Sequence, residues 1–227
     1  MATVIFYAIL ILEIPLAIIS FVFASLILSR RKNPIYFNFG MAVLFLAFWL
    51  TGIVVNSFGL LPSFSSLIEN LTFALGIGIL HYLLIFTLSF PLPAKNRSLK
   101  IGILYFFTAL IVLSCFIPGL YTVSVVNIPP FIYFDANPLG LALFSIYFVL
   151  LSILSFVNLF YSYKNSDGIF RSQLKKIILG TIFAVIVNLF FSITIFFWSR
   201  FETSPIGALF VFTVLIYIYS ILFSKKV

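Results

Sequence analysis

Charge is scarce in this sequence. Lys, Arg, Asp and Glu make up 8% of its 227 residues, whereas 63% of the residues are apolar. A water-soluble domain usually carries about three times this share of charged residues. The composition therefore excludes a soluble globular domain and indicates an integral membrane protein. The net charge of +8 is then expected to face anionic lipid head groups, and we expect no nucleic-acid partner.

Cysteine and histidine occur only once each, as Cys115 and His81. A single cysteine excludes an internal disulfide. One histidine and one cysteine cannot supply the three or four ligands of a conventional zinc site, so we expect no metal and no cofactor. Lysine is absent from the last apolar run, which excludes a retinal Schiff base there.

Apolar runs fill most of the chain, and seven of them approach the roughly 20 residues that a membrane-spanning helix needs. All Lys and Arg residues except Arg200 follow the first, third, fifth or seventh run. Short positive loops stay in the cytoplasm. The pattern therefore predicts an all-α, polytopic membrane protein with seven transmembrane helices, the N-terminus outside and the C-terminus in the cytoplasm.

The seven spans form one predicted domain over residues 1–227. Their approximate limits are residues 4–28, 35–55, 71–90, 101–117, 139–161, 177–198 and 206–223. The longest gap contains two β-prone stretches around a turn signal, which predicts a hairpin over residues 121–134 on the outer side. This hairpin is either an ordinary connector or a lid over a ligand site.

Acidic residues number five and do not form a cluster. Glu69, Asp135 and Glu202 are placed in or near the outer gaps, and Asp167 is alone in an inner gap. A metal-dependent enzyme that acts on lipid phosphates needs acids or histidines gathered on one side of the membrane. The chain also lacks a phosphate-binding Gly-rich loop and a G-x-S-x-G motif. We therefore predict that it is not an enzyme.

Three polar residues, Glu13, His81 and Asn188, are placed near the middle of their spans. A charged side chain there costs about 2.5–3.5 kcal/mol on insertion scales, so such residues usually face the bundle interior. Small or polar residues continue each face: Ala17, Ser20 and Ala24 with Glu13; Asn70, Ala74 and Gly78 with His81; Gly180, Ala184 and Ser192 with Asn188. Two interpretations stay open. The three residues form a pocket that binds a ligand or a proton, or a hydrogen-bonded cluster that only holds the bundle together.

Four segments carry a family resemblance: GIGILHYLLIFTLSFP (residues 76–91), the segment opening NPLG (residues 137–163), RSQLKKIILGTIFAVIVN (residues 171–188) and SPIGALFVFTVLIYIYSILFSKK (residues 204–226). In layout and in these motifs the chain resembles the N-terminal seven-transmembrane sensory region of bacterial and archaeal histidine kinases and related signalling proteins. Members of that family continue into a signalling helix and a catalytic domain. This sequence stops at Val227, so the resemblance implies an isolated sensor with a separate partner, or a truncated piece.

We therefore predict a membrane-embedded sensory and signal-transduction module that lacks an output domain. The alternative is a small carrier, or an accessory subunit of a transporter, that uses the same inward polar residues. The predicted cytoplasmic signalling surface contains Arg171, Lys175, Lys176 and Lys225. The expected partners are the lipid bilayer, a separate cytoplasmic kinase or cyclase, an unknown small ligand and a second copy of the chain in a homodimer. The expected location is a prokaryotic plasma membrane.

Overall fold

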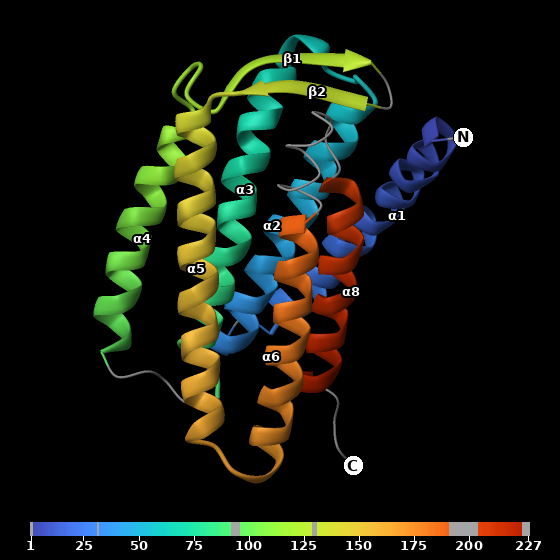
Figure 1. Ribbon diagram of the computed structural model, residues 1–227. Coiled ribbons are helices and arrows are strands. Elements are labelled where there is room, and N and C mark those ends of the chain that lie inside the picture. Colours follow the sequence, from blue (N-terminus) through green and yellow to red (C-terminus); the bar gives the residue numbers. More distant parts are fainter. Residues whose placement is uncertain (1, 31, 92–95, 129–130, 191–203, 224–227) are drawn as a thin grey trace.

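Long helices dominate the structure, a computed structural model that describes residues 2–30, 32–91, 96–128, 131–190 and 204–223 (Figure 1). Within these residues seven helices have 18 to 27 residues. They are α1 (Ala2–Leu28), α2 (Pro34–Ser57), α3 (Ser65–Thr87), α4 (Arg97–Ser114), α5 (Pro138–Lys164), α6 (Gly168–Leu189) and α8 (Ser204–Phe223). A 3-10 turn, η1 (Pro62–Phe64), precedes α3. The seven helices follow the order of the seven predicted spans.

Among the described residues, five of these helices, α1 to α5, contain a segment long and apolar enough to cross a membrane. Helix α8 contains a shorter apolar stretch, Phe210–Ile221. Most of the second half of the predicted sixth span, residues 191–198, lies outside the described residues. The fold is therefore helical, with at least five candidate spans.

Two helices begin with the same local motif, an asparagine followed by a proline. The side-chain oxygens of Asn33 and Asn137 accept hydrogen bonds of 2.9 Å from the backbone N–H groups of Ile35 and Leu139. Asparagine is a favoured N-cap, and proline fits the first helical position because it lacks the N–H that would have no partner there. These two motifs explain why α2 and α5 begin within one residue of their predicted limits.

Two helices begin six or more residues earlier than the apolar runs predict. Helix α3 begins at Ser65 rather than at residue 71, and α6 begins at Gly168 rather than at residue 177. The predicted limits follow hydropathy, whereas a helix continues through polar residues when their side chains reach water or a partner. Arg171, Lys175 and Lys176 consequently lie on the first turns of α6, where all three are exposed, and not in a loop.

A two-stranded antiparallel sheet connects α4 to α5. Strands β1 (Thr122–Ile128) and β2 (Phe131–Ala136) pair from Thr122 with Ala136 to Ile128 with Phe131. The sequence predicts a hairpin at this place with slightly different limits. The hairpin lies across one end of the bundle, next to the starts of α3 and α5 (Figure 1). Its base is anchored by Asn137, whose side-chain amide donates to the carbonyl of Gly119 at 2.9 Å.

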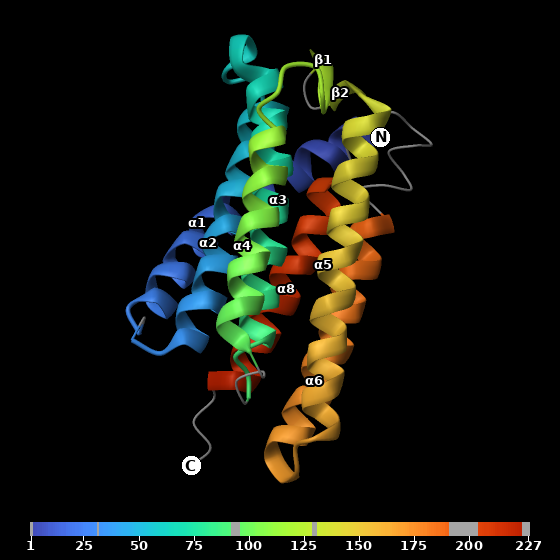
Figure 2. The same ribbon diagram turned by 90° about the vertical axis from the view of Figure 1, so that its left-hand side faces the viewer.

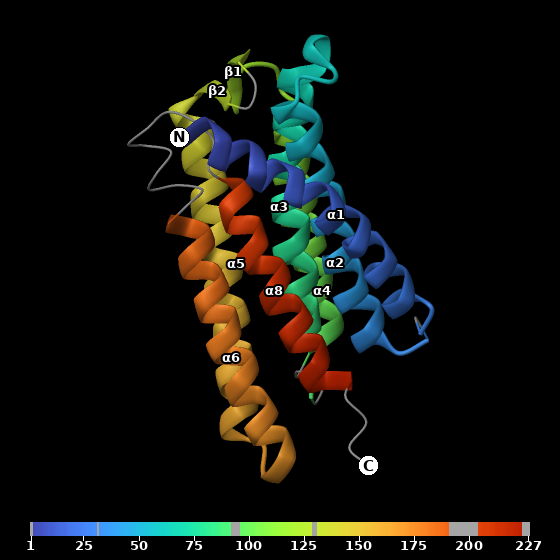
Figure 3. The same cartoon turned by 90° about the vertical axis from the view of Figure 1, so that its right-hand side faces the viewer.

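Helices α1 to α4 form one side of the bundle, and α5, α6 and α8 form the other (Figures 2 and 3). Successive helices run in opposite directions. The α1–α2 turn, the start of α4, the α5–α6 turn and the C-terminal end of α8 therefore lie at the end opposite the hairpin (Figures 1 and 3). These are the segments that carry most of the basic residues.

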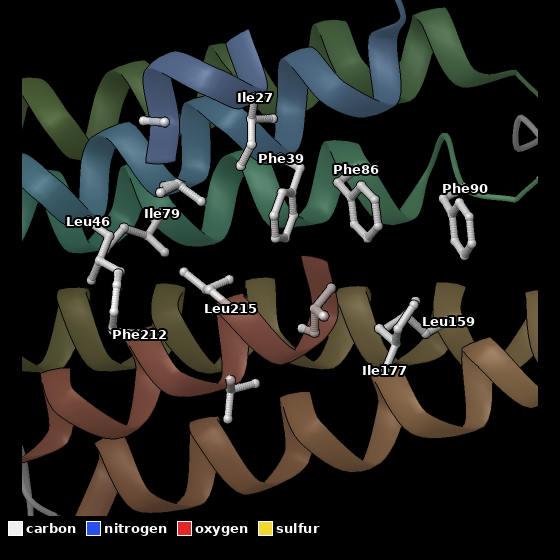
Figure 4. Close-up of a cluster of buried hydrophobic side chains, with 14 of the residues drawn as sticks. Ile27, Phe39, Leu46, Ile79, Phe86, Phe90, Leu159, Ile177, Phe212 and Leu215 are labelled. Carbon is white, nitrogen blue, oxygen red and sulfur yellow. The ribbon is translucent and has the colours of Figure 1, made fainter. Parts of the chain in front are cut away.

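The main hydrophobic core lies where the two sides face each other (Figure 4). Phe39, Leu46 and Phe86 come from the first side, and Leu159 and Leu215 come from the second. Within the first side, Gly78 lets α3 approach α2 closely. A Cβ atom at Gly78 would overlap the ring of Phe45. The contact between the two sides includes a cavity.

Candidate functional site

An apolar cavity of about 150 Å³ lies between the two sides of the bundle. We call it the interlayer cavity. It follows α3 from Glu69 to Thr87 and α5 from Leu141 to Leu159, and α2, α6 and α8 complete the wall. The wall includes six phenylalanines, namely Phe39, Phe73, Phe86, Phe144, Phe148 and Phe156. The wall is thus mostly apolar and extends along much of α3 and α5. Small-molecule sites are typically concave and lined mainly by apolar side chains.

The hairpin end of the cavity carries a buried carboxylate, Glu69, of which 3% is exposed. Its Oε2 accepts a hydrogen bond of 3.0 Å from the side-chain amide of Asn56 on α2. The sequence places Glu69 in or near an outer gap. In the structure it lies near the start of α3, which begins at Ser65. The burial of Glu69 in the first turns of α3 is tolerated because Asn56 supplies a hydrogen-bond partner for its carboxyl group.

The hairpin contacts the wall of the cavity at the same end. The ring of Tyr121, just before β1, lies 5.7 Å from the ring of Phe73, and Phe73 lies 4.9 Å from Phe144 on α5. The hydroxyl of Tyr121 is 2.9 Å from that of Ser114 at the end of α4. Tyr121 therefore joins the hairpin to helices α3 and α4 beside the cavity.

A second polar group is centred on His81, which is 2% exposed. Its Nδ1 lies 2.8 Å from the hydroxyl of Thr108 on α4, which lies 2.7 Å from the hydroxyl of Tyr147 on α5. His81 Nε2 is buried and has no hydrogen-bond partner among the described residues. The ring also makes an edge contact with Tyr105, with 4.5 Å between centroids. This chain of hydrogen bonds connects α3, α4 and α5.

Glu13 lies on a buried face of α1. Its side chain is 0% exposed, as are those of Ser20 and Ala24 along the same face, and Ala17 is 7% exposed. The predicted inward face of the first helix is thus buried. Helix α1 packs against α2 and α8, whereas His81 is hydrogen-bonded to Thr108 on α4, which is in turn bonded to Tyr147 on α5. Among the described residues, this chain of hydrogen bonds does not include Glu13.

The third predicted residue of this group, Asn188, lies near the end of α6. Its side chain is outside the described part of the structure, as is Ser192. Gly180 and Ala184, on the predicted inward face, are partly buried, and Ala184 lines the interlayer cavity. A pocket that combines Glu13, His81 and Asn188 stays a prediction.

At the end opposite the hairpin, α6 is connected to its neighbours by polar contacts. The side-chain amide of Gln173 donates to the carbonyl of Ile221 in the last turn of α8 at 2.9 Å. The guanidinium of Arg171 lies 5.1 Å from the ring centroid of Tyr163 on α5, within the range of cation–π contacts. Lys225, the fourth residue of the predicted signalling surface, is outside the described residues. These contacts make α5, α6 and α8 one connected unit at this end.

The sequence did not identify Asn56, Glu69, Thr108 or Tyr147 as site residues. Thr108 and Tyr147 resemble ordinary span residues until the neighbours of α3 are known. Among the described residues, no three His, Cys, Asp or Glu side chains lie close enough together to hold a metal ion.

Comparisons with known proteins agree with this architecture. The family model "N-terminal 7TM region of histidine kinase" matches residues 14–225. Comparison with curated proteins gives no match. The matched region includes all of the described helices except the first residues of α1, and with them the interlayer cavity and both polar groups. The chain is therefore an integral membrane protein that belongs to the family of N-terminal 7TM regions of histidine kinases.

Proposed function

We propose that the chain is a sensory module that spans a prokaryotic plasma membrane seven times, with the N-terminus outside and the C-terminus in the cytoplasm. Two observations support the topology. The seven helices alternate in direction, and the basic segments around Arg30, Arg97 and Arg171 lie at the end opposite the hairpin (Figure 1). Positive segments of this kind stay in the cytoplasm.

The observation that carries the sensory role is the family match over residues 14–225, because this family is the input region of signalling proteins. We assign no catalytic step to the chain. Its task is to convert a stimulus in the membrane into a change at the cytoplasmic end.

The interlayer cavity is the proposed input site. It separates two groups of helices whose contact surface is interrupted there, so a ligand between them changes how the two groups pack. Packed helices shift between discrete arrangements by about 1–2 Å. A ligand favours one arrangement only if it binds that arrangement more tightly.

The proposed output is the cytoplasmic end of α5, α6 and α8. Gln173 and Arg171 join these three helices there, so a shift of one helix is passed to the other two. Arg171, Lys175 and Lys176 are exposed on α6 and, together with Lys225, form the surface proposed to meet a kinase or cyclase partner.

Purification from the native locus tests this proposal. The chain is tagged at its N-terminus, extracted in mild detergent, and its companions and native mass are determined. We expect a copurifying kinase or cyclase, or a longer native chain that carries one. A companion that is a transporter, or a solitary 25.7 kDa chain, would contradict the sensory role.

A further inference from the structure

The interlayer cavity has the dimensions of an extended chain rather than of a compact ligand. Glu69 and Thr87 are the first and last residues of α3 in its wall. Their Cα atoms are eighteen helical steps apart, which corresponds to about 27 Å. A volume of about 150 Å³ distributed over this length leaves a narrow space. One unbranched chain matches this shape better than a ring system.

The wall of the cavity offers little to a polar ligand. Its five hydroxyl side chains all donate to backbone carbonyls of their own helices, at 2.7–2.9 Å: Thr72, Thr87, Ser152, Ser155 and Thr181. Apart from Glu69 and the indole of Trp49, the remaining wall side chains are apolar. An apolar occupant therefore leaves no wall hydroxyl without a hydrogen-bond acceptor.

One end differs from the rest, because Glu69 and its partner Asn56 lie there. An ionised carboxylate only accepts hydrogen bonds. A head group that donates, such as a hydroxyl or an ammonium, suits this end. A carboxylate or phosphate head would place two acidic groups side by side, and two such groups cannot both be ionised without a cost in free energy.

We propose that the interlayer cavity binds one single-chain amphiphile whose head group is a hydroxyl or an ammonium. The alkyl chain lies between the two groups of helices, and the head lies beside Glu69 at the hairpin end. This inference rests on the proposed function, since it names the chemical class of the stimulus. Binding itself requires no partner protein and can be measured on the isolated chain.

The chain contains a convenient internal probe. Trp49 lines the cavity, and the sequence has two tryptophans, so Trp198→Phe leaves Trp49 as the only one. Three straight-chain probes of equal length, each brominated on the chain, are added to the purified full-length protein in detergent: an alcohol, an amine and a carboxylic acid. Bromine quenches tryptophan fluorescence at short range.

We expect saturable quenching of Trp49 by the alcohol and the amine, and affinity at least about tenfold lower for the acid, a ratio that corresponds to about 1.4 kcal/mol. Ser152→Phe fills the cavity and should abolish saturable quenching. The matched control, Leu154→Phe, places the same ring on an exposed position of α5 and should leave it intact. Glu69→Gln should reduce the difference between the amine and the acid.

Quenching that rises linearly without saturation, or that Ser152→Phe leaves unchanged, would overturn the inference, because the probes would then only partition into the micelle. Equal affinity for all three probes would overturn the head-group assignment.

If Ser152→Phe does not fold, Thr181→Phe fills the cavity from α6, with Ile182→Phe at an exposed position as its control. Loss of binding leaves the sensory role standing. Saturable binding without any effect on a coupled kinase would instead contradict the assignment of the interlayer cavity as the input site.

Discussion

Thr108 is a buried polar residue on α4, a helix whose surface is otherwise largely exposed. Its hydroxyl lies between His81 Nδ1 and the hydroxyl of Tyr147, and all three side chains are buried. Most of α4 faces outward, with Leu104 and Thr108 as its buried residues. The polar chain therefore supplies much of the specific contact that fixes α4 against α3 and α5.

Thr108→Val is expected to lower the free energy of unfolding by about 1–2 kcal/mol. The substitution keeps the shape of the side chain and removes the hydroxyl, so that His81 and Tyr147 each lose a hydrogen bond. Such bonds contribute about 0.6 kcal/mol on average between membrane helices, and up to about 1.7 kcal/mol. Unfolding of the purified protein in mixed micelles with a denaturing detergent measures the change.

The control for this prediction is Thr51→Val. The hydroxyl of Thr51 donates to the carbonyl of Ala47 in its own helix, so its loss breaks no contact between helices. Equal stability of the two variants would contradict the role given to Thr108.

Glu13→Gln tests whether the buried face of α1 has a role beyond packing. The two side chains have nearly the same shape, but glutamine cannot carry a charge or release a proton. If Glu13 belongs to a ligand or proton site, the variant should lose the response of a coupled kinase and keep a melting temperature close to that of the parent. An intact response with a lower melting temperature would assign Glu13 to structure alone.

Single residues could be predicted where their surroundings follow from one helix. Glu13 and His81 were singled out as buried because a polar residue within a span usually faces other helices, and both are at most 2% exposed. Thr108, Tyr147 and Asn56 could not be found in this way. Their importance depends on which helices are neighbours, and one sequence does not contain that information.

Among the elements, the junction between the hairpin and α5 depends on a glycine. A Cβ atom at Gly140 would overlap the carbonyl oxygen of Leu120. That oxygen belongs to the backbone and cannot move without displacing the chain that leads into β1. Gly140 thus permits the close approach that holds the hairpin at the end of the bundle.

Gly140→Ala should destabilise the protein by about 1–3 kcal/mol, the usual cost of overpacking a filled site. Gly102→Ala on α4 is the matched control, because a Cβ there meets no atom within 4 Å and alanine favours the helix by about 0.8–1.0 kcal/mol. Thermal unfolding of the two variants should change in opposite directions. A shift of the same sign and size in both would contradict the packing described for Gly140.

Element positions were predictable to the extent that hydropathy determines them. Helices α2 and α5 begin within one residue of prediction because an Asn-Pro cap sets each start. Helices α3 and α6 begin earlier because a polar turn can remain helical, buried beside Asn56 in one case and exposed in the other. Hydropathy locates the apolar part of a helix and gives no information about a polar extension.

For the whole molecule, the proposed topology makes opposite predictions for its two ends. In a Cys115→Ala background, Ser124→Cys lies on the hairpin and Asn165→Cys lies at the α5–α6 turn, and both positions are exposed. A membrane-impermeant maleimide should label Ser124→Cys in intact cells and Asn165→Cys only after permeabilisation. The reverse pattern would contradict the topology. Labelling of both in intact cells would also contradict it, because the two positions would then lie on the same side of the membrane, whereas the proposed topology has one crossing, α5, between them.

The most direct test adds a ligand for the interlayer cavity and measures kinase activity at the cytoplasmic end of the same protein. The catalytic region of a histidine kinase is fused after Val227, the fusion is placed in lipid nanodiscs, and autophosphorylation is followed as a straight-chain amine is added. Coupling between sites typically changes an equilibrium about 5- to 150-fold. We predict a change in rate of about fivefold or more in the parent and in Leu154→Phe, and none in Ser152→Phe. A constant rate in the parent, while quenching of Trp49 shows that the amine is bound, would contradict the claim that the interlayer cavity controls the cytoplasmic end.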